Sequence, residues 1–449
     1  MQTQRDHVHA HQFMMGRLSS ALVLGDPAGA EVPGRRALTG LIIGVLIATL
    51  VVAGFGVYGW IVPGGSKAYR QPGLILVEKE SGNRYVYSDG LLHAVPDLPA
   101  ALLRQGASAK VKLVSRASLA GVPRGLALGI PDGPRSVPAP ELFVHGPWLA
   151  CLPDNPDGRR LGLELDPRAL FTPIPPERLS VVRDQSGTIH LLTKGYRHRV
   201  TDDAVLVALG VTEARAALAP ESWLSQIPAG VELGSAVVPG RGRPGPSVAG
   251  RSYDIGTLFR QSAGTGGEQF FVLRADGLAT MSHTEFLVAE VRSGAKPVTL
   301  NGADLLTAPR SADRSLLDRL PDLAGAAEHR LDDQVLCLRQ APVSTDSVSS
   351  LLVEMPRSVA PMDNAGRGTV RGPVGGGMAV VGVPTARDGD PPVFFVSSAG
   401  VAFRLKDAAA AAALKIDQVR PVPFPQELLA ALRPGPTLSR EAVTVLVEG

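Results

Sequence analysis

Few residues of this sequence have the types and spacing that catalysis, metal binding or a disulfide requires. Its only two cysteines, Cys151 and Cys337, stand far apart, and three of its nine histidines alternate as His7, His9 and His11. Residues on one face of a helix are three or four apart, so this trio would not converge on a metal ion there. The even cysteine count predicts a disulfide if this part of the chain lies in an oxidising compartment, and two buried free thiols otherwise.

Strings with a known catalytic or nucleotide-binding geometry do not occur. The P-loop G-x-x-x-x-G-K-[ST] is absent, as are G-x-S-x-G, H-E-x-x-H and C-x-x-C. We interpret the glycine clusters at 264–267 and 375–377 and the arginine-bearing segment 240–245 as exposed loops, and the adjacent pair Asp332 and Asp333 as a solvated turn. The sequence therefore predicts no catalytic residue, no metal site and no cofactor.

One uncharged apolar stretch, residues 37–62, organises the rest of the chain. About 20 apolar residues in a helix cross a hydrocarbon core, so this stretch predicts a transmembrane helix. Gly40, Gly44 and Ala48 form a stripe of small residues along which helices can pack, although glycine is common in membrane spans anyway. The expected membrane anchor residues are Leu41, Val45, Leu50, Phe55, Tyr58 and Trp60, the last two at the far interface.

The charges that flank this stretch predict its orientation. Arg35 and Arg36 abut its N-terminal end, which favours a cytoplasmic N-terminus. A cleaved signal peptide is the alternative, but the apolar run is longer than is typical and starts far from Met1. Residues 6–24 predict an amphipathic helix that ends at 25–27 and lies on the membrane surface or docks a partner.

Length and composition predict a large, turn-rich region beyond the span. The chain has 449 residues, 45% of them hydrophobic, with 50 glycines and 38 prolines, which indicates a sizeable core built of short elements. The net charge of +3 gives no case for binding nucleic acid.

Four segments of this region repeat one pattern of strands, a helix and an apolar tail. The first segment turns at Asp89-Gly90, and we expect helices near 97–105 and 202–209 in the first two segments and over the alanine run 408–413 in the fourth. The four segments begin at Leu74, Leu179, Phe270 and Val393. Their tails align a leucine at 119, 224, 305 and 429, a proline at 123, 228 and 309, and a glycine at 125, 230 and 435. Because their spacing is unequal, they cannot stack directly as a solenoid does. We expect the intervening segments to form a separate core, with strands at 141–145, 235–238 and 334–338.

The predicted fold class is therefore α+β, with one N-terminal transmembrane helix, a β-rich core and four small β/α repeat lobes. The predicted divisions are a tail 1–36, a transmembrane helix 37–62, a linker 63–73, repeats 74–130, 179–235, 269–311 and 392–438, core segments 131–178, 236–268 and 312–391, and a C-terminal strand 439–449.

These features together resemble a known family. The string HQFMMGRLSSALVLGD at 11–26, the single span, the Pro-Gly-Gly at 63–65, the four repeats and the two distant cysteines resemble EccB. EccB is a membrane component of type VII (ESX) secretion systems in actinobacteria. The resemblance covers essentially the whole chain.

The resemblance implies a single-pass protein of the inner cell membrane, with a cytoplasmic N-terminus and an elongated extracytoplasmic region. It implies a central β domain with a disulfide and four lobes similar to a cell-wall-binding module. The implied partners are EccC-, EccD- and EccE-like subunits, a MycP-like protease, further copies of the chain, membrane lipid and the cell wall.

The implied function is that of a structural subunit, which anchors a secretion channel and braces it on the extracytoplasmic side. A membrane-anchored protein that binds peptidoglycan is an alternative. A further alternative is an ATP hydrolase, since some family members carry that label, but the sequence has no string that would cradle a triphosphate.

Overall fold

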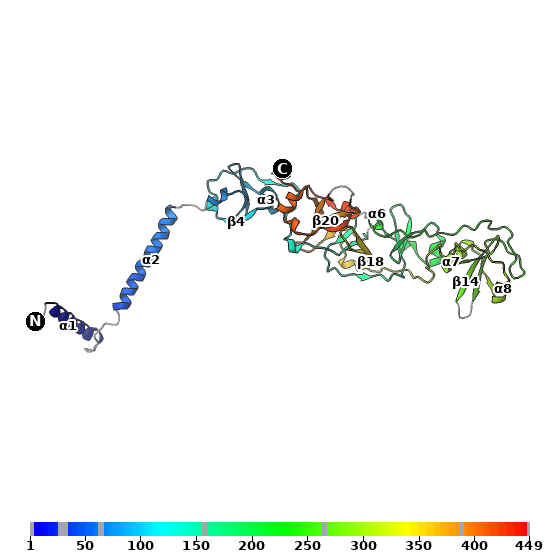
Figure 1. Cartoon of the computed structure of the whole chain (residues 1–449), viewed down its shortest axis with the longest axis horizontal. Helices are drawn as coiled ribbons and strands as arrows, with labels where there is room; N and C mark the ends of the chain where they lie inside the picture. The colour runs from blue at the N-terminus through cyan, green and yellow to red at the C-terminus, as the bar shows by residue number, and fades with distance from the viewer. Residues whose placement is uncertain are drawn as a thin grey trace. The chain divides into compact units, whose positions relative to one another are not determined.

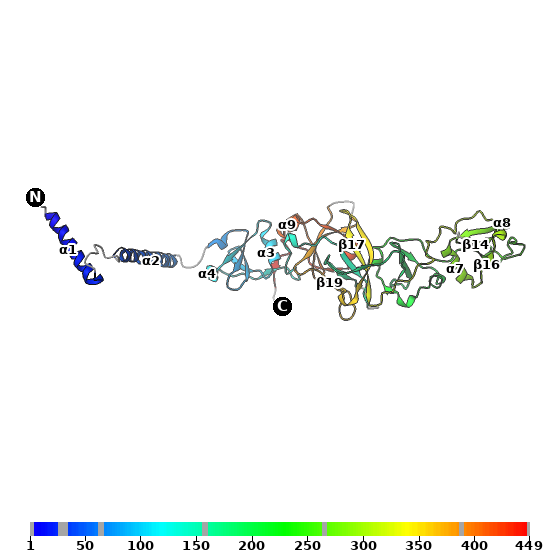
Figure 2. The same cartoon turned by 90° about the horizontal axis from the view of Figure 1, so that it is seen from below.

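The computed structural model describes residues 4–25, 35–61, 67–154, 160–262, 267–385 and 390–446. It is a mixed α/β chain that begins with two long helices, α1 (Gln4–Leu24) and α2 (Arg35–Ile61), drawn in blue in Figure 1 and, from a second side, in Figure 2. The chain divides into two compact units. The first contains these helices with residues 67–70, 78–80 and 113–122, and the second contains the other described residues.

Helix α1 confirms the helix predicted for residues 6–24 and begins two residues earlier. It ends at Gly25, whose φ of 67° is the left-handed conformation that glycine adopts without steric cost. The Gly25 N–H donates to the Ala21 carbonyl over 3.2 Å, which satisfies one of the last helical acceptors.

Helix α2 contains 27 residues and is about 40 Å long at the standard helical rise. From Ala37 to Gly59 it is long and apolar enough to cross a membrane, and none of that stretch is buried against the rest of the described chain. The Thr49 hydroxyl donates to the Val45 carbonyl over 2.8 Å, so this polar group is satisfied within the helix. Residues 62–66, which open the predicted linker, lie outside the described residues.

Four small sheets follow, each built of strands that succeed one another in the chain. The first sheet contains β1 (Leu74–Glu78), β2 (Arg84–Ser88), β3 (Leu91–Ala94) and β4 (Lys110–Val114). The second contains β9 (Ser180–Arg183), β10 (Ile189–Thr193), β11 (Tyr196–Arg199) and β12 (Ala217–Leu218). The third contains β13 (Leu258–Ser262), β14 (Glu268–Arg274), β15 (Gly277–Met281) and β16 (Val298–Leu300). The fourth contains β20 (Gly377–Val383), β21 (Val393–Ser397), β22 (Val401–Arg404), β23 (Val422–Pro425) and β24 (Arg433–Pro434).

One strand order recurs in all four small sheets. In each, the third, second, first and fourth strands in chain order lie side by side, and β24 extends the fourth sheet beyond β22. The fourth strand pairs parallel to the first in the second, third and fourth sheets. Two hairpins turn through residues of positive φ, at Asp89-Gly90 and Lys194-Gly195, which is the geometry of a two-residue type I′ loop.

A helix follows the third strand of each small sheet, and a second helix follows the fourth strand; the second helix is the shorter one in the first three sheets. These pairs are α3 (Leu98–Gln105) and α4 (Arg116–Leu119), α5 (Ala204–Leu209) and α6 (Glu221–Leu224), α7 (His283–Ser293) and α8 (Gly302–Thr307), and α9 (Ala408–Ala413) and α10 (Gln426–Ala431). Helix α9 is the alanine run of the sequence, and its N-cap Asp407 accepts from the Ala410 N–H over 2.8 Å. The predicted helices near 97–105 and 202–209 are α3 and α5.

Two of the small sheets begin earlier than the segments predicted for them. The third sheet starts with β13 at Leu258 and the fourth with β20 at Gly377, so Phe270 and Val393 lie in second strands. Both first strands lie in segments predicted to belong to the core, 236–268 and 312–391. In the first sheet a five-residue connection joins the first two strands, whereas nine residues separate β20 from β21, and this longer insertion hid the pattern.

A six-stranded sheet, which we call the central sheet, has the strand order β19-β7-β6-β17-β18-β8. Its strands are β6 (Trp148–Cys151), β7 (Gly162–Glu164), β8 (Thr172–Pro173), β17 (Gln334–Pro342), β18 (Val348–Pro356) and β19 (Val370–Arg371). The strand predicted at 334–338 is the start of β17. A separate two-stranded sheet pairs β5 (Leu128–Gly129) with β25 (Thr444–Val445). Strand β25 lies within the predicted C-terminal strand 439–449.

Two predicted core strands are wrong. Glu141 lies in a 3₁₀ turn, Pro140–Leu142, and from segment 141–145 only Phe143 forms a bridge, to Gly377. Residues 235–238 contain no strand. Ala236 and Val238 pack from a loop against the apolar cluster around Leu258, so their apolar pattern reports burial without strand pairing.

Candidate functional site

The cysteines lie at the centre of the central sheet. Cys151 of β6 and Cys337 of β17 are directly opposite each other in the antiparallel ladder and form a disulfide. Both residues are completely buried, in a cluster with Leu149, Val335 and Val353. The bond confirms the expected disulfide and closes a covalent loop that contains the second and third small sheets.

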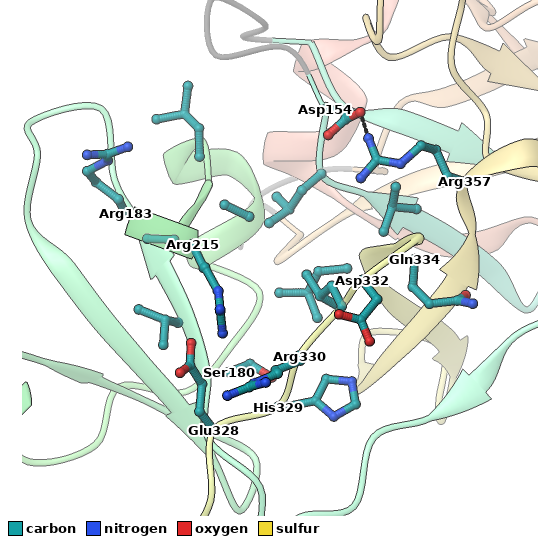
Figure 3. Close-up of a pocket in the computed structure, with 18 of the residues that line it drawn as sticks. Asp154, Ser180, Arg183, Arg215, Glu328, His329, Arg330, Asp332, Gln334 and Arg357 are labelled. Carbon is teal, nitrogen blue, oxygen red and sulfur yellow. Dashed lines mark ion pairs between the residues drawn. The ribbon is translucent and has the colours of Figure 1, made fainter. Parts of the chain in front are cut away.

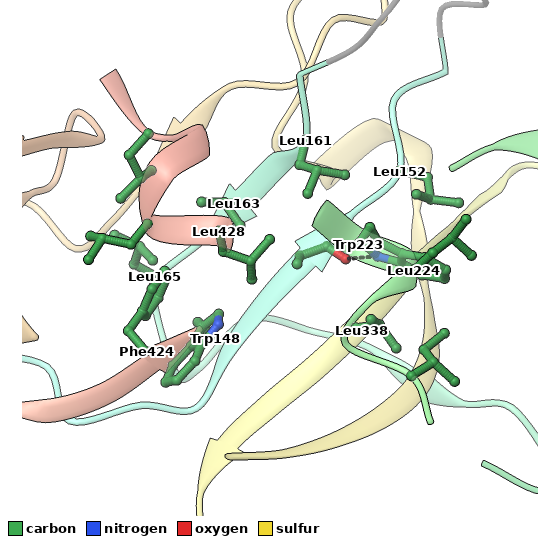
Figure 4. Packing of buried hydrophobic residues seen from close by; sticks show 14 of the residues in the cluster. Trp148, Leu152, Leu161, Leu163, Leu165, Trp223, Leu224, Leu338, Phe424 and Leu428 are labelled. Carbon is green, nitrogen blue, oxygen red and sulfur yellow. Dashed lines mark hydrogen bonds between the residues drawn. The ribbon is translucent and has the colours of Figure 1, made fainter. Parts of the chain in front are cut away.

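Two tryptophans lie on the face of the central sheet opposite the disulfide, as Figure 4 shows. The Trp148 indole N–H donates to Gln340 Oε1 over 2.9 Å, and the Trp223 indole N–H donates to the Ala150 carbonyl over 2.8 Å. Trp148 also stacks on Phe424, with 4.7 Å between ring centroids. Because Trp223 belongs to α6 and Phe424 to β23, this cluster ties the second and fourth small sheets to the central one.

Three of the small sheets contain an aromatic ring packed on a glycine 32 residues later. A Cβ built on Gly125 would lie 2.3 Å from the His93 ring, and one on Gly230 would lie 2.3 Å from the His198 ring. The corresponding pair in the fourth sheet is Phe403 and Gly435, at 2.4 Å. Glycine is required at these positions because any side chain would displace the ring.

The third sheet replaces this contact with two small residues. Its equivalent strand position is Ala279, and the position that corresponds to Gly125 is Ser311, whose N–H donates to the Leu278 carbonyl as Gly125 donates to Leu92. Without a ring, the glycine is not needed. This explains why the third predicted repeat lacks the tail glycine. The aligned tail glycines do not by themselves reveal their ring partners, although the constant 32-residue separation could have revealed them.

Two carboxylates, Asp184 and Glu285, are held by partners within the fold. Burial raises the pKa of Asp184, but hydrogen bonds from the Ser186 hydroxyl, the His190 ring and the backbone of Thr188 and Ser186 outweigh burial and lower that pKa to about 2. Glu285 is fully buried and forms an ion pair with Arg319, whose Nη2 lies 2.8 Å from Glu285 Oε2. Both carboxylates are occupied by partners within the fold.

No group of three metal-ligating side chains occurs among the described residues. His7, His9 and His11 are exposed along α1. Asp333 pairs with Arg357, and Asp332 lines a cavity. The glycine cluster at 375–377 runs from a turn into β20, and most of the cluster at 264–267 lies outside the described residues.

The predicted membrane residues lie on α2. Leu41, Val45, Leu50, Phe55 and Tyr58 are all exposed, and the side chain of Trp60 lies outside the described part. Cβ atoms built on Gly40 and Gly44 would have no described atom within 4 Å. With Ala48 these glycines leave one open helical face, as the stripe of small residues requires.

A family model described as "Type VII secretion system ESX-1, transport TM domain B" matches residues 1–449, the whole chain. Among curated relatives, the ESX-5 secretion system ATPase EccB5 of Mycobacterium tuberculosis is 26% identical over 97% of this chain and 92% of its own length. The ESX-1 secretion system ATPase EccB1 of the same organism is 24% identical over 98% of this chain and 94% of its own length.

Solved structures share the fold. A chain of an intact ESX-5 inner membrane complex matches with a TM-score of 0.61 and 24% identity, over 100% of this chain and 96% of that one. An EccB3 dimer from the ESX-3 core complex matches with a TM-score of 0.57 and 22% identity, over 83% of this chain and 100% of that one. With the family model matched from end to end, the chain belongs to the EccB family of type VII secretion subunits.

Proposed function

We propose that this chain anchors a type VII secretion complex in the inner membrane and braces it on the extracytoplasmic side. The observation that carries the proposal is the fully exposed apolar helix α2, joined to a large disulfide-bonded region. An apolar helix without a protein partner needs lipid around it, and a disulfide persists in an oxidising compartment. These two facts favour a span with residues 67–446 outside the cytoplasm.

The four small sheets are copies of one module in this proposal. Their shared strand order, their helix pairs and the ring–glycine contacts of three of them support this reading. The lobes then begin at β1, β9, β13 and β20, and the central sheet is the core that joins them. Rigid lobes fastened to a covalently closed core suit a role in bracing other subunits.

The proposed partners are membrane subunits like EccC, EccD and EccE, a MycP-like protease and a second copy of the chain. The support is that similar chains were solved in an ESX-5 inner membrane complex and as an EccB3 dimer. We propose the stripe of Gly40, Gly44 and Ala48 as the face of α2 that packs on a neighbouring span. The name ATPase belongs to the relatives, and we assign no nucleotide hydrolysis to this chain.

Single added cysteines test the topology cleanly, because the natural pair is disulfide-bonded and cannot react. We would place one on α1 by Ser19→Cys and one on the exposed part of β18 by Ser349→Cys. A membrane-impermeant maleimide should label Ser349→Cys in intact cells, and Ser19→Cys only after permeabilisation. The unmodified chain is the control. Labelling of Ser19→Cys alone in intact cells would reverse the proposed orientation.

A further inference from the structure

A cavity of about 460 Å³ lies between the second small sheet and the central sheet (Figure 3). Its walls come from β9, from the 3₁₀ turn Glu213–Arg215, from the segment 328–332 and from the start of β17. Leu152, Val181 and Leu336 contribute apolar surface. The volume falls within the range typical of ligand pockets, about 300–1,000 Å³.

Three arginines line this cavity, and none of them has an ion pair among the described residues: Arg183, Arg215 and Arg330. Arg357 also lines it but is engaged by Asp154 and Asp333. Figure 3 shows the side chains of Arg215 and Arg330 directed into the part of the cavity that Glu328 also faces. Unpaired guanidinium groups around a concave surface are suited to bind carboxylates, because their planar donors match a carboxylate in two parallel hydrogen bonds.

The wall also contains an unsatisfied buried hydroxyl. Ser180 is 3% exposed, lines the cavity, and its Oγ has no hydrogen-bond partner among the described residues. A polar atom that is buried in this way is normally paired. A ligand that enters the cavity would give this hydroxyl the partner that the surrounding chain does not supply.

The acidic residues of the cavity restrict the chemical class of ligand that it can bind. Glu328 and Asp332 line it together with the arginines, so a polyphosphate with several adjacent negative charges would meet repulsion as well as attraction. A peptide carries both carboxylates for the arginines and N–H donors for these acids. We propose that the cavity binds a short acidic peptide segment of a partner protein, with its carboxylates on Arg215 and Arg330 and a polar backbone group on Ser180.

The test is a selection from a display library of random heptapeptides on the purified full-length chain in mild detergent. The charge variant is Arg215→Gln with Arg330→Gln. The matched control is Arg404→Gln with Arg420→Gln, which removes two exposed arginines outside the cavity. Because binding is measured on the isolated chain, the result does not depend on the proposed role in secretion. Circular dichroism melts establish that each variant is folded.

We expect peptides rich in Asp and Glu to be enriched on the unmodified chain and on the control. A fluorescent copy of an enriched peptide should bind at least tenfold more weakly to the charge variant and several-fold more weakly to Ser180→Ala, and its Asn/Gln analogue should lose affinity similarly. Failure to enrich acidic peptides, or equal binding by the charge variant, would overturn the proposal. Displacement of the peptide by equimolar ATP would also overturn it, in favour of a polyphosphate site.

Discussion

At the scale of single residues, three of the small sheets depend on a glycine, because its lack of a side chain leaves room for a neighbouring ring. Gly230 lets the His198 ring lie over the backbone, and that ring is fixed by a hydrogen bond of 2.9 Å between its Nδ1 and the Val231 carbonyl. The same Nδ1 contact recurs in the first sheet between His93 and Leu126. The ring therefore cannot move away from an added methyl group without losing this bond.

We predict that Gly230→Ala destabilises the second small sheet by about 1–3 kcal/mol, the usual cost of overpacking. Urea unfolding followed by tryptophan fluorescence would measure the loss of stability, since Trp223 lies in α6, a helix of the second small sheet. Gly302→Ala is the matched control, because a Cβ built on Gly302 meets no described atom within 4 Å and the same added methyl group should cost much less. Equal losses at the two positions would show that the ring contact does not set the requirement.

Asp184 provides a prediction about pH. Its folded pKa of about 2 lies below the unfolded value near 3.8, so the ionised form stabilises the fold. This contribution is complete above about pH 4 and is lost as the pH falls toward 2. We predict that Asp184→Asn lowers the unfolding free energy at pH 7 by about 1–2 kcal/mol, allowing for partial solvent exposure.

The difference between Asp184→Asn and the unmodified chain should shrink steadily between pH 4 and pH 2. Thermal melts over this range would measure it. A difference that stays constant with pH would mean that the charge of Asp184 contributes nothing and that only the shape of its turn matters.

At the scale of elements, the disulfide fixes β6 to β17 across a sequence separation of 186 residues. We predict that Cys151→Ala with Cys337→Ala lowers the free energy of unfolding by about 2–5 kcal/mol, mostly because the unfolded chain gains conformational entropy without the cross-link. A Trp60→Phe background leaves Trp148 and Trp223 as the only tryptophans, and both report on the central sheet. Fluorescence melts should therefore show the loss directly.

The native protein should resist reduction by dithiothreitol until it unfolds, since both cysteines are buried. A melting temperature unchanged by the double substitution would contradict the prediction.

The sequence predicted those elements that carry their own local signal. Helix α2 follows from an uncharged run, α9 from an alanine run, and the β2–β3 hairpin from Asp89-Gly90. The start of the third sheet was missed because β13 lies before the predicted segment. Residues 235–238 were mistaken for a strand because Ala236 and Val238 are partly buried, packing from a loop against an apolar cluster. Burial and strand pairing leave the same apolar pattern in a sequence.

The cavity could not be predicted from sequence. Its arginines come from β9, from the turn before β12 and from the segment before β17, which are brought together only by the packing of the second small sheet on the central sheet. The disulfide was easier, because only two cysteines exist and one pairing is possible. Long-range contacts of side chains that neither a unique pairing nor a repeat restricts leave no trace in one sequence.

At the scale of the whole molecule, the chain is a structural subunit of a type VII secretion complex. Its membership of the EccB family covers the entire chain. The open stripe on α2 adds a specific expectation for assembly, since Gly44→Leu would block close approach of a neighbouring span without disturbing any described contact.

Co-purification from the native membrane in mild detergent, followed by mass spectrometry and native gel electrophoresis, tests this most directly. We predict that the tagged chain brings type VII membrane subunits with it in one large particle, and that Gly44→Leu yields less of that particle while the chain itself stays folded. A chain that purifies alone and runs as a monomer would contradict the account.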